Sequence, residues 1–234
     1  MEKESWQRFP TNALAGASQA DLEAFVAGLT PGAPVIIMLE GVQWGPRAGE
    51  TLAAIPAGVE LRFLCIRGTL VGDPGLAALA NSPALGSVRT LLLERCGLTD
   101  ATTPALFSAR PLPKLTGLHL GNRQGIPAGP LNHLTDLTAL TLANSTALPS
   151  LQELDLWNTS VGDAGWEAIA NSPNLAKLQS AYAWGTGLTA ECAQKIKGTS
   201  YQRLIATSSS GPPLSKCWYH TDYDERTISW TEDA

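Results

Sequence analysis

Apolar residues recur along most of this chain at alternating positions within short segments. The pattern LxxLxLxx(N/C/T)xL fits four segments well: LRFLCIRGTLV, VRTLLLERCGL, LQELDLWNTSV and LQSAYAWGTGL, which begin at residues 61, 88, 151 and 178. In the last of them, Ala stands at two of the Leu positions. Alternation over such a short run predicts one strand per segment, with the leucines pointing inward and the residues between them pointing outward.

Looser copies of the pattern extend the array. PVIIMLEGVQW begins at 34, LTGLHLGNR at 115, LTALTLANS at 137 and YQRLIA at 201. The starts at 34, 61, 88 and 115 are 27 residues apart, and so are those at 151 and 178. The Gly- and Pro-rich segment 121–136 breaks this spacing, leaving one unit of 22 residues and one of only 14. We expect either a strand with a truncated return over 137–148 or a defect in the array there.

This pattern resembles the leucine-rich repeat family, in its longer class of the ribonuclease-inhibitor and cysteine-containing kind, over residues 34–206. The resemblance implies an α/β leucine-rich repeat solenoid, with a curved parallel sheet on the concave face and short helices on the convex face. The physical expectation agrees. One short strand cannot bury its own apolar face, so successive units must stack and share a core.

A second repeated phrase predicts the return from strand to strand. VGDPGLAALANSPAL at 71–85 and VGDAGWEAIANSPNL at 161–175 are identical at ten of fifteen positions. Each is expected to form a short helix capped by its own Asp73 or Asp163, with Pro74 in a first turn. Residues 189–198 predict a third such helix. The residue eight after a repeat start is small and polar, and is expected to satisfy backbone groups where the chain turns; these residues are Thr69, Cys96, Ser145, Thr159 and Thr186.

The two ends have the character of caps. Residues 1–33 predict an N-terminal helical cap, with a capping box from Ser18 to Asp21 and an apolar stripe of Leu22, Phe25, Val26 and Leu29. Residues 207–234 form a linker followed by an acidic and aromatic segment. This segment is either a cap hairpin, with Trp218 near Trp230, or a flexible tail.

Composition excludes several classes of function. The net charge is −5, but residues 35–206 hold twelve basic and twelve acidic residues, and no basic stripe of the kind that binds nucleic acid is present. No signal peptide or membrane-spanning run is found, and four cysteines do not make a disulfide framework. We therefore expect a cytoplasmic protein that binds neither nucleic acid nor membrane.

Catalytic and cofactor chemistry find little support in the sequence. Cys217 and His220 have CxxH spacing, but no second ligand pair completes a zinc site. No nucleophile elbow or glycine-rich phosphate loop occurs. We expect no metal, no cofactor and no enzymatic activity; the rival hypothesis is an enzyme that uses residues 214–234.

What remains is the concave surface, which the family resemblance makes the usual binding site. Trp157 and Trp184 stand at equivalent outward positions of consecutive units, about 5 Å apart, and are expected to face solvent. The candidate partner-binding residues are Trp157, Trp184, Tyr182, Glu153, Asp155, Arg67, Glu94 and His119. The alternative is that the C-terminal segment covers the two indoles.

The sequence thus predicts a non-catalytic protein-binding module, monomeric when free, whose concave face contacts a protein partner through aromatic residues. One concrete alternative is a bacterial immunity protein that neutralises a toxin by one-to-one binding, since an acidic face suits a basic toxin. Another is a scaffold or effector that binds a host or signalling protein.

Overall fold

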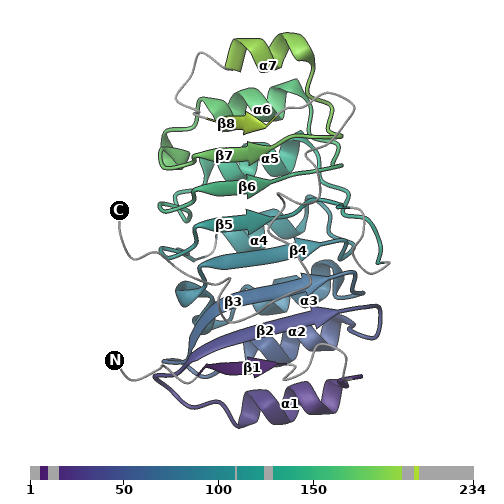
Figure 1. The fold of residues 1–234 in the computed structure, drawn as a ribbon, viewed down its shortest axis with the longest axis vertical. Helices are drawn as coiled ribbons and strands as arrows, with labels where there is room; N and C mark the ends of the chain where they lie inside the picture. The colour runs from purple at the N-terminus through teal and green to yellow at the C-terminus, as the bar shows by residue number, and fades with distance from the viewer. Residues whose placement is uncertain (1–5, 10–15, 109, 124–128, 197–202, 206–234) are drawn as a thin grey trace.

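The strands of this chain join in a single parallel sheet whose spatial order follows the chain, from β1 to β8 (Figure 1). The computed structural model describes residues 6–9, 16–108, 110–123, 129–196 and 203–205. The strands are β1 (Gln7–Phe9), β2 (Pro34–Glu40), β3 (Glu60–Arg67), β4 (Thr90–Glu94), β5 (Gly117–His119), β6 (Glu153–Asp155), β7 (Ser180–Tyr182) and β8 (Arg203–Ile205).

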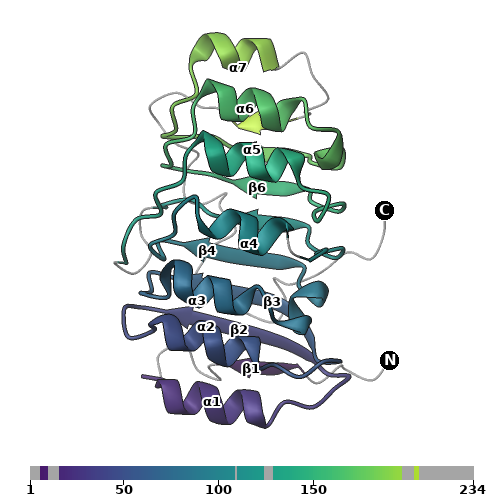
Figure 2. The same ribbon diagram turned by 180° about the vertical axis from the view of Figure 1, so that it is seen from behind.

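A short helix follows each strand from β1 to β7, and these helices cover one face of the sheet (Figures 1 and 2). The helices are α1 (Gln19–Ala27), α2 (Pro46–Ala53), α3 (Gly72–Leu79), α4 (Thr102–Ser108), α5 (Asp136–Asn144), α6 (Asp163–Ala170) and α7 (Ala190–Ile196). Single 3-10 turns at Pro83–Ser87 and Pro173–Leu175 lead into β4 and toward β7. The result is a parallel α/β architecture that repeats from strand to strand. None of the helices described here is long and apolar enough to cross a membrane.

The apolar core lies between the sheet and the helices, as the alternating pattern predicts. The inward residues of the strands are buried, among them Leu64, Ile66, Leu91 and Leu93. From the other side come helix residues of the repeated phrase, Leu76 and Leu79 of α3 and Trp166 and Ile169 of α6. Each unit therefore buries its leucines against its own helix and the neighbouring units.

The register of the sheet confirms the 27-residue spacing for most units. Cys65 pairs with Met38 on one side and with Leu92 on the other, each 27 residues away. Tyr182 pairs with Asp155 at the same spacing. Equivalent positions of successive units therefore stand side by side, and each position of the repeat forms a row across the sheet.

The prediction of a strand over 137–148 is wrong, whereas the alternative prediction, a break in the array there, agrees with the structure. LTALTLANS lies in helix α5, whose N-cap residue Thr135 accepts a hydrogen bond from the amide of Leu137. His119 pairs directly with Asp155, 36 residues later, so one long unit replaces the two short ones. The alternation was misleading because two of its leucines, Leu137 and Leu140, are largely exposed, whereas Leu142 is buried.

The aspartates of the repeated phrase act differently from the prediction. Helices α3 and α6 have no side-chain cap, so Asp73 and Asp163 do not cap their own helices. Each carboxylate instead accepts hydrogen bonds from the next unit: Asp73 from the amide and hydroxyl of Thr99, at 2.9 and 2.6 Å, and Asp163 from the same groups of Thr189, at 2.7 and 2.8 Å. The phrase recurs because it ties neighbouring units together.

The same link occurs in the units that lack the phrase. Asp100 accepts hydrogen bonds from the amides and hydroxyls of Thr135 and Thr138. Asp136 accepts from the amides of Gly162 and Gly165, at 2.6 and 3.2 Å. A row of aspartates thus satisfies the first-turn amides of the following helices, which have no partners within the helix itself.

The small polar residues at the turns perform the predicted role in most units. Cys96 Sγ donates to the carbonyl of Ile66 at 2.7 Å, Thr159 Oγ1 to that of Leu156 at 2.6 Å, and Thr186 Oγ1 to that of Ala183 at 2.7 Å, while Thr69 Oγ1 accepts from the amide of Val71. Ser145 instead follows α5 and donates to the carbonyl of Phe107.

In the long unit, a buried asparagine supplies the turn bonds. Asn132 Oδ1 accepts from the amides of Cys96 and Leu98, and its Nδ2 donates to the carbonyls of Leu93 and Leu120. Three of these bonds are made with the preceding unit and one with Leu120 of the same unit, so Asn132 fixes the long segment against both.

Helix α1 forms with the predicted capping box of Ser18 and Asp21. Leu22, Val26 and Leu29 are buried, and Phe25 packs against Phe9. The sequence pattern did not reveal that Phe9 belongs to a further strand, β1, which pairs with β2. The predicted cap hairpin or tail at 207–234 lies outside the described residues.

Removal of one aspartate link should destabilise the fold. We expect Asp100→Ala to lower the free energy of unfolding by about 1–2 kcal/mol, because it leaves the amides and hydroxyls of Thr135 and Thr138 without their acceptor. Urea denaturation followed by circular dichroism measures the effect. Glu50→Ala, at an exposed position of α2, is the matched control; equal stability of the two variants would contradict a role for the link.

Candidate functional site

The candidate residues lie on the face of the sheet that carries no described helix (Figure 1). Two rows run across this face. His119, Asp155 and Tyr182 stand side by side in the first row, which begins with Met38, Cys65 and Leu92. The second row lies two residues further along the chain in each unit. It contains Glu40, Arg67 and Glu94 within their strands and Gly121, Trp157 and Trp184 just past the ends of β5, β6 and β7.

The structure brings the eight predicted residues onto one face but buries most of them. The exposed fraction is 7% for Trp157 and zero for both Asp155 and Glu94. Arg67 and His119 are also buried. Glu153, Tyr182 and Trp184 are half-buried. The expectation that both indoles face solvent is therefore wrong for Trp157 and holds in part for Trp184.

Trp157 is buried because other groups of the same face pack on its ring. Its ring centroid lies 4.7 Å from that of Trp184, with the planes at 62°. The guanidinium of Arg123 lies 5.0 Å from the Trp157 ring and 5.5 Å from that of Tyr182. Edge-on aromatic packing and a cation over a ring face are both favourable geometries, so the indole is held between two partners.

Charges alternate along the second row. Arg67 forms an ion pair with Glu40 and lies 4.0 Å from an oxygen of Glu94. Arg123 lies 3.4 Å from the other oxygen of Glu94 and also pairs with Asp155. Each carboxylate of this row therefore has an arginine beside it, which a buried charge requires.

Gly121 makes the position of Arg123 possible. Every other unit from β2 to β7 carries a large side chain at this place in the row, whereas Gly121 carries none. A Cβ there would come within 2.8 Å of the Trp157 amide and 2.9 Å of an Asp155 oxygen. The guanidinium of Arg123, two residues later, therefore lies between Glu94 and Trp157, where the missing side chain would have been.

Sequence reasoning missed Arg123, because it lies in the Gly- and Pro-rich segment 121–136 that breaks the repeat. The signal that could have found it was Gly121 itself. A row that alternates in charge, Glu40 then Arg67 then Glu94, requires a cation at the next place and has none in the strand.

His119 lies between two carboxylates of strand β6. Its Nδ1 lies 3.5 Å from an oxygen of Asp155 and its Nε2 lies 3.7 Å from an oxygen of Glu153. Burial alone would lower the pKa of His119, but the hydrogen bond and charge of Asp155 outweigh it and raise the pKa above its usual value. Burial likewise opposes ionisation of Asp155, yet His119 and Arg123 hold its pKa below the usual range.

Glu94 has the opposite character. Burial raises its pKa to about 7, and the negative charge of Asp155 adds to this effect. Among the residues that the structure describes, neither carboxylate oxygen of Glu94 accepts a hydrogen bond, and the buried Nε1–H of Trp157 donates none. Glu94 is therefore a carboxyl group that is partly protonated at neutral pH inside a network of charges.

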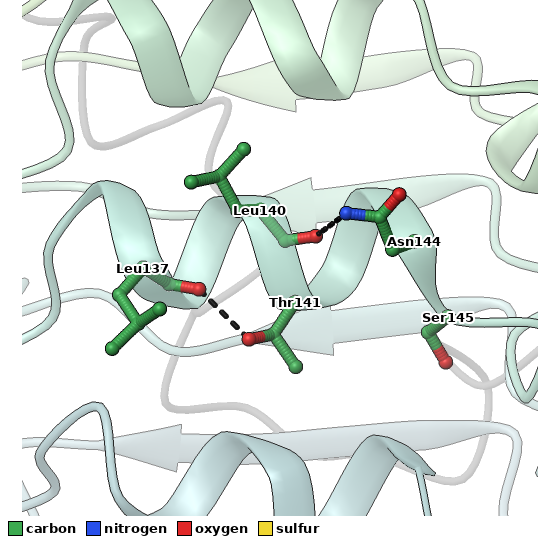
Figure 3. Close-up of a pocket in the computed structure, with 5 residues that line it drawn as sticks. All are labelled: Leu137, Leu140, Thr141, Asn144 and Ser145. Atoms are coloured by element: carbon green, nitrogen blue, oxygen red, sulfur yellow. Dashed lines mark hydrogen bonds between the residues drawn. The ribbon is translucent and has the colours of Figure 1, made fainter.

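The candidate residues of this face form a network of ion pairs together with Arg123. The charges of this network are paired with one another, and no group of three or more potential metal ligands occurs within the described part of the chain. The CxxH pair at 217–220 lies outside that part. A groove on the other side of the molecule is lined by α5 residues, including Leu137 and Leu140, and is separate from the candidate residues (Figure 3).

No protein-family model matches the chain, and a comparison with curated proteins finds no match.

The charge network predicts that stability falls as the pH rises. The pKa of Glu94 is raised from an ordinary value of 4.5 to about 7, so its contribution is fully present below pH 4.5 and is lost as the pH passes 7. His119, whose pKa is also raised, acts in the same direction. Between pH 5 and pH 8 we expect the free energy of unfolding to fall by about 3 kcal/mol.

Glu94→Gln provides the test, because glutamine keeps the shape without the ionisation. We expect the variant to lose clearly less stability than the unaltered chain between pH 5 and pH 8, as measured by denaturant unfolding at each pH. Glu50→Gln, on the exposed side of α2, should follow the unaltered chain. Parallel pH curves for Glu94→Gln and the control would show that Glu94 does not govern the slope.

Proposed function

We propose that this chain is a leucine-rich repeat solenoid that binds a protein partner through the helix-free face of its sheet, without catalysis. The support for the repeat is physical. Units of 27 residues pair in register, bury the leucines of LxxLxL and are tied to one another by a row of aspartates. An array of this kind presents one extended surface that fits a protein better than a small molecule.

The observation that carries the binding proposal is the half-exposed pair Tyr182 and Trp184 above a buried base. We call these two residues, with Glu153 beside them, the aromatic patch. Aromatic rings on a polar face dominate the binding energy of many protein interfaces. Only the half-exposed residues of the aromatic patch can touch a partner. Trp157, Asp155 and His119 are buried beside them and support the patch.

The remaining candidate residues support the patch from a distance. Arg67 and Glu94 are buried members of the charge row and fix Arg123, which in turn packs on Trp157 and Tyr182. Since most of the carboxylates are paired within the molecule, the face offers less negative charge than its composition suggests. A toxin-neutralising role is one form that this binding could take, decided by which partner is found.

Binding is tested with single variants on a purified partner. A partner captured from the source organism and identified by mass spectrometry is produced separately, and its affinity is measured by calorimetry. We expect Trp184→Ala to weaken binding by more than about 2 kcal/mol, roughly thirtyfold. Leu137→Ala, at a residue of α5 that is 57% exposed on the opposite face, should leave the affinity unchanged. The reverse ranking would place the interface on the helices.

Trp157 requires a different measurement because it is buried. We expect Trp157→Ala to reduce the free energy of unfolding by about 3–5 kcal/mol, since it opens a cavity under Trp184 and removes the ring that Arg123 contacts. Thermal denaturation of both variants provides the check, and Trp184→Ala should lose distinctly less stability than Trp157→Ala. Equal losses would mean that the two indoles are buried alike.

A further inference from the structure

We infer that the aromatic patch binds an extended basic segment of the partner, with an arginine side chain stacked on Trp184. This inference rests on the proposed function and specifies the chemistry of the partner. The observation that carries it is the position of Arg123, whose guanidinium lies against aromatic rings of the same face.

Arg123 shows what the aromatic row accepts. Its guanidinium lies against two rings, Trp157 of the second row and Tyr182 of the first, and pairs with the carboxylate of Asp155. One ring from each row and one carboxylate therefore make a site for a planar cation. Trp157 has a second neighbour, Trp184, at the equivalent position of the next unit.

Trp184 repeats the role of Trp157 one unit further along. The second row runs from Arg123 to Trp157 and then to Trp184, and Trp184 is more exposed than Trp157. Indole is the ring that attracts cations most strongly, and its contact with Trp157 fixes its orientation in advance. A cation of the partner stacked on Trp184 would occupy the place on that ring that Arg123 occupies on Trp157.

Glu153 supplies the negative charge that such a segment requires. Asp155 is fully buried and pairs with Arg123 and His119, so it is not accessible to a partner. The side chain of Glu153 is 37% exposed, and its contact with His119 Nε2 is long, at 3.7 Å. Glu153 is therefore the carboxylate of this region that a partner can reach.

The spacing of the two contacts determines the shape of the occupant. Glu153 pairs laterally with Ser180, the first residue of β7, and Trp184 lies four residues after Ser180, in the turn that follows the strand. Four residues of chain span up to about 13 Å, so two side chains of an extended segment match the two points better than one does. A segment that lies along β7 with two basic residues four positions apart reaches both.

Arginine is favoured over lysine because its planar guanidinium stacks on a ring and gives up its water more readily. Lysine can reach Glu153 but gains less on Trp184. An apolar anchor, the other occupant of an aromatic surface, would have no preference for charge, and this difference makes the two occupants distinguishable.

Three peptides of seven residues provide the test, with the sequence Gly-Arg-Ser-Gly-Ser-Arg-Gly, blocked at both ends, and the same sequence with lysine or with citrulline in place of arginine. Citrulline has the shape of arginine without its charge. The probe is the indole Nε1–H resonance of Trp184 in a nitrogen-15 correlation spectrum, assigned with Trp184→Phe.

We expect a saturable shift of the Trp184 resonance with the arginine peptide, binding at least about fivefold weaker with lysine, and no saturable shift with citrulline. Glu153→Gln should lower the affinity for the arginine peptide by about threefold or more, and added salt should lower that affinity further. Spectra of Glu153→Gln that keep the dispersion of the unaltered chain show that the variant is folded.

The outcomes separate this inference from the proposed function. Equal shifts with arginine and citrulline, or none with either, would overturn the basic segment. If Trp184→Ala still weakens the purified partner in that case, the proposed function stands with an apolar anchor instead. Arginine binding together with a partner affinity that Trp184→Ala leaves unchanged would overturn the proposed function and keep the cation site.

Discussion

In-register pairing of parallel strands is the constraint on which the rest of this molecule depends. Because a residue pairs with the one 27 positions later, every position of the repeat becomes a row of side chains about 4.8 Å apart. A leucine row makes the core, an aspartate row links the helices, and two outward rows make the candidate site. The side chain at a given position of one unit must therefore be compatible with the side chains at the same position of the two neighbouring units.

Rows of charge are the severe case of this constraint. Two like charges at that separation repel by about 3 kcal/mol at an effective dielectric constant of 20. The second outward row avoids this cost by alternation, with Glu40, Arg67 and Glu94 in order. Where the order would next need a cation, the strand has Gly121, and Arg123 reaches back from the following loop. The row then changes from ion pairs to stacked indoles, which carry no net charge.

The parts of the fold that follow from this periodicity could be read from the sequence, and the parts that break it could not. The strands from 61, 88, 151 and 178 and the burial of their leucines were predictable because each leucine has an equivalent in the next unit. Helix α5 was mistaken for a strand because Leu137, Leu140 and Leu142 fit the LxxLxL frame. The helix buries a different set, Thr138, Ala139, Leu142 and Ala143, and leaves two of those leucines exposed. The role of Asp73 was assigned to its own helix because local capping is visible in a sequence, whereas a bond to Thr99 of the next unit is not.

Burial of Trp157 changes the meaning of the candidate site more than any other difference. An indole exposed on all sides would lose rotational freedom when it bound a partner, and that loss would reduce the affinity. Trp184 rests on an indole that is itself fixed by Arg123, and Arg123 is fixed by Glu94 and Asp155. The entropy of ordering the ring is therefore largely lost during folding and not during association. In the proposed interface, a row of buried charges that does little by direct contact would thus strengthen binding, because it holds the half-exposed indole of Trp184 in place.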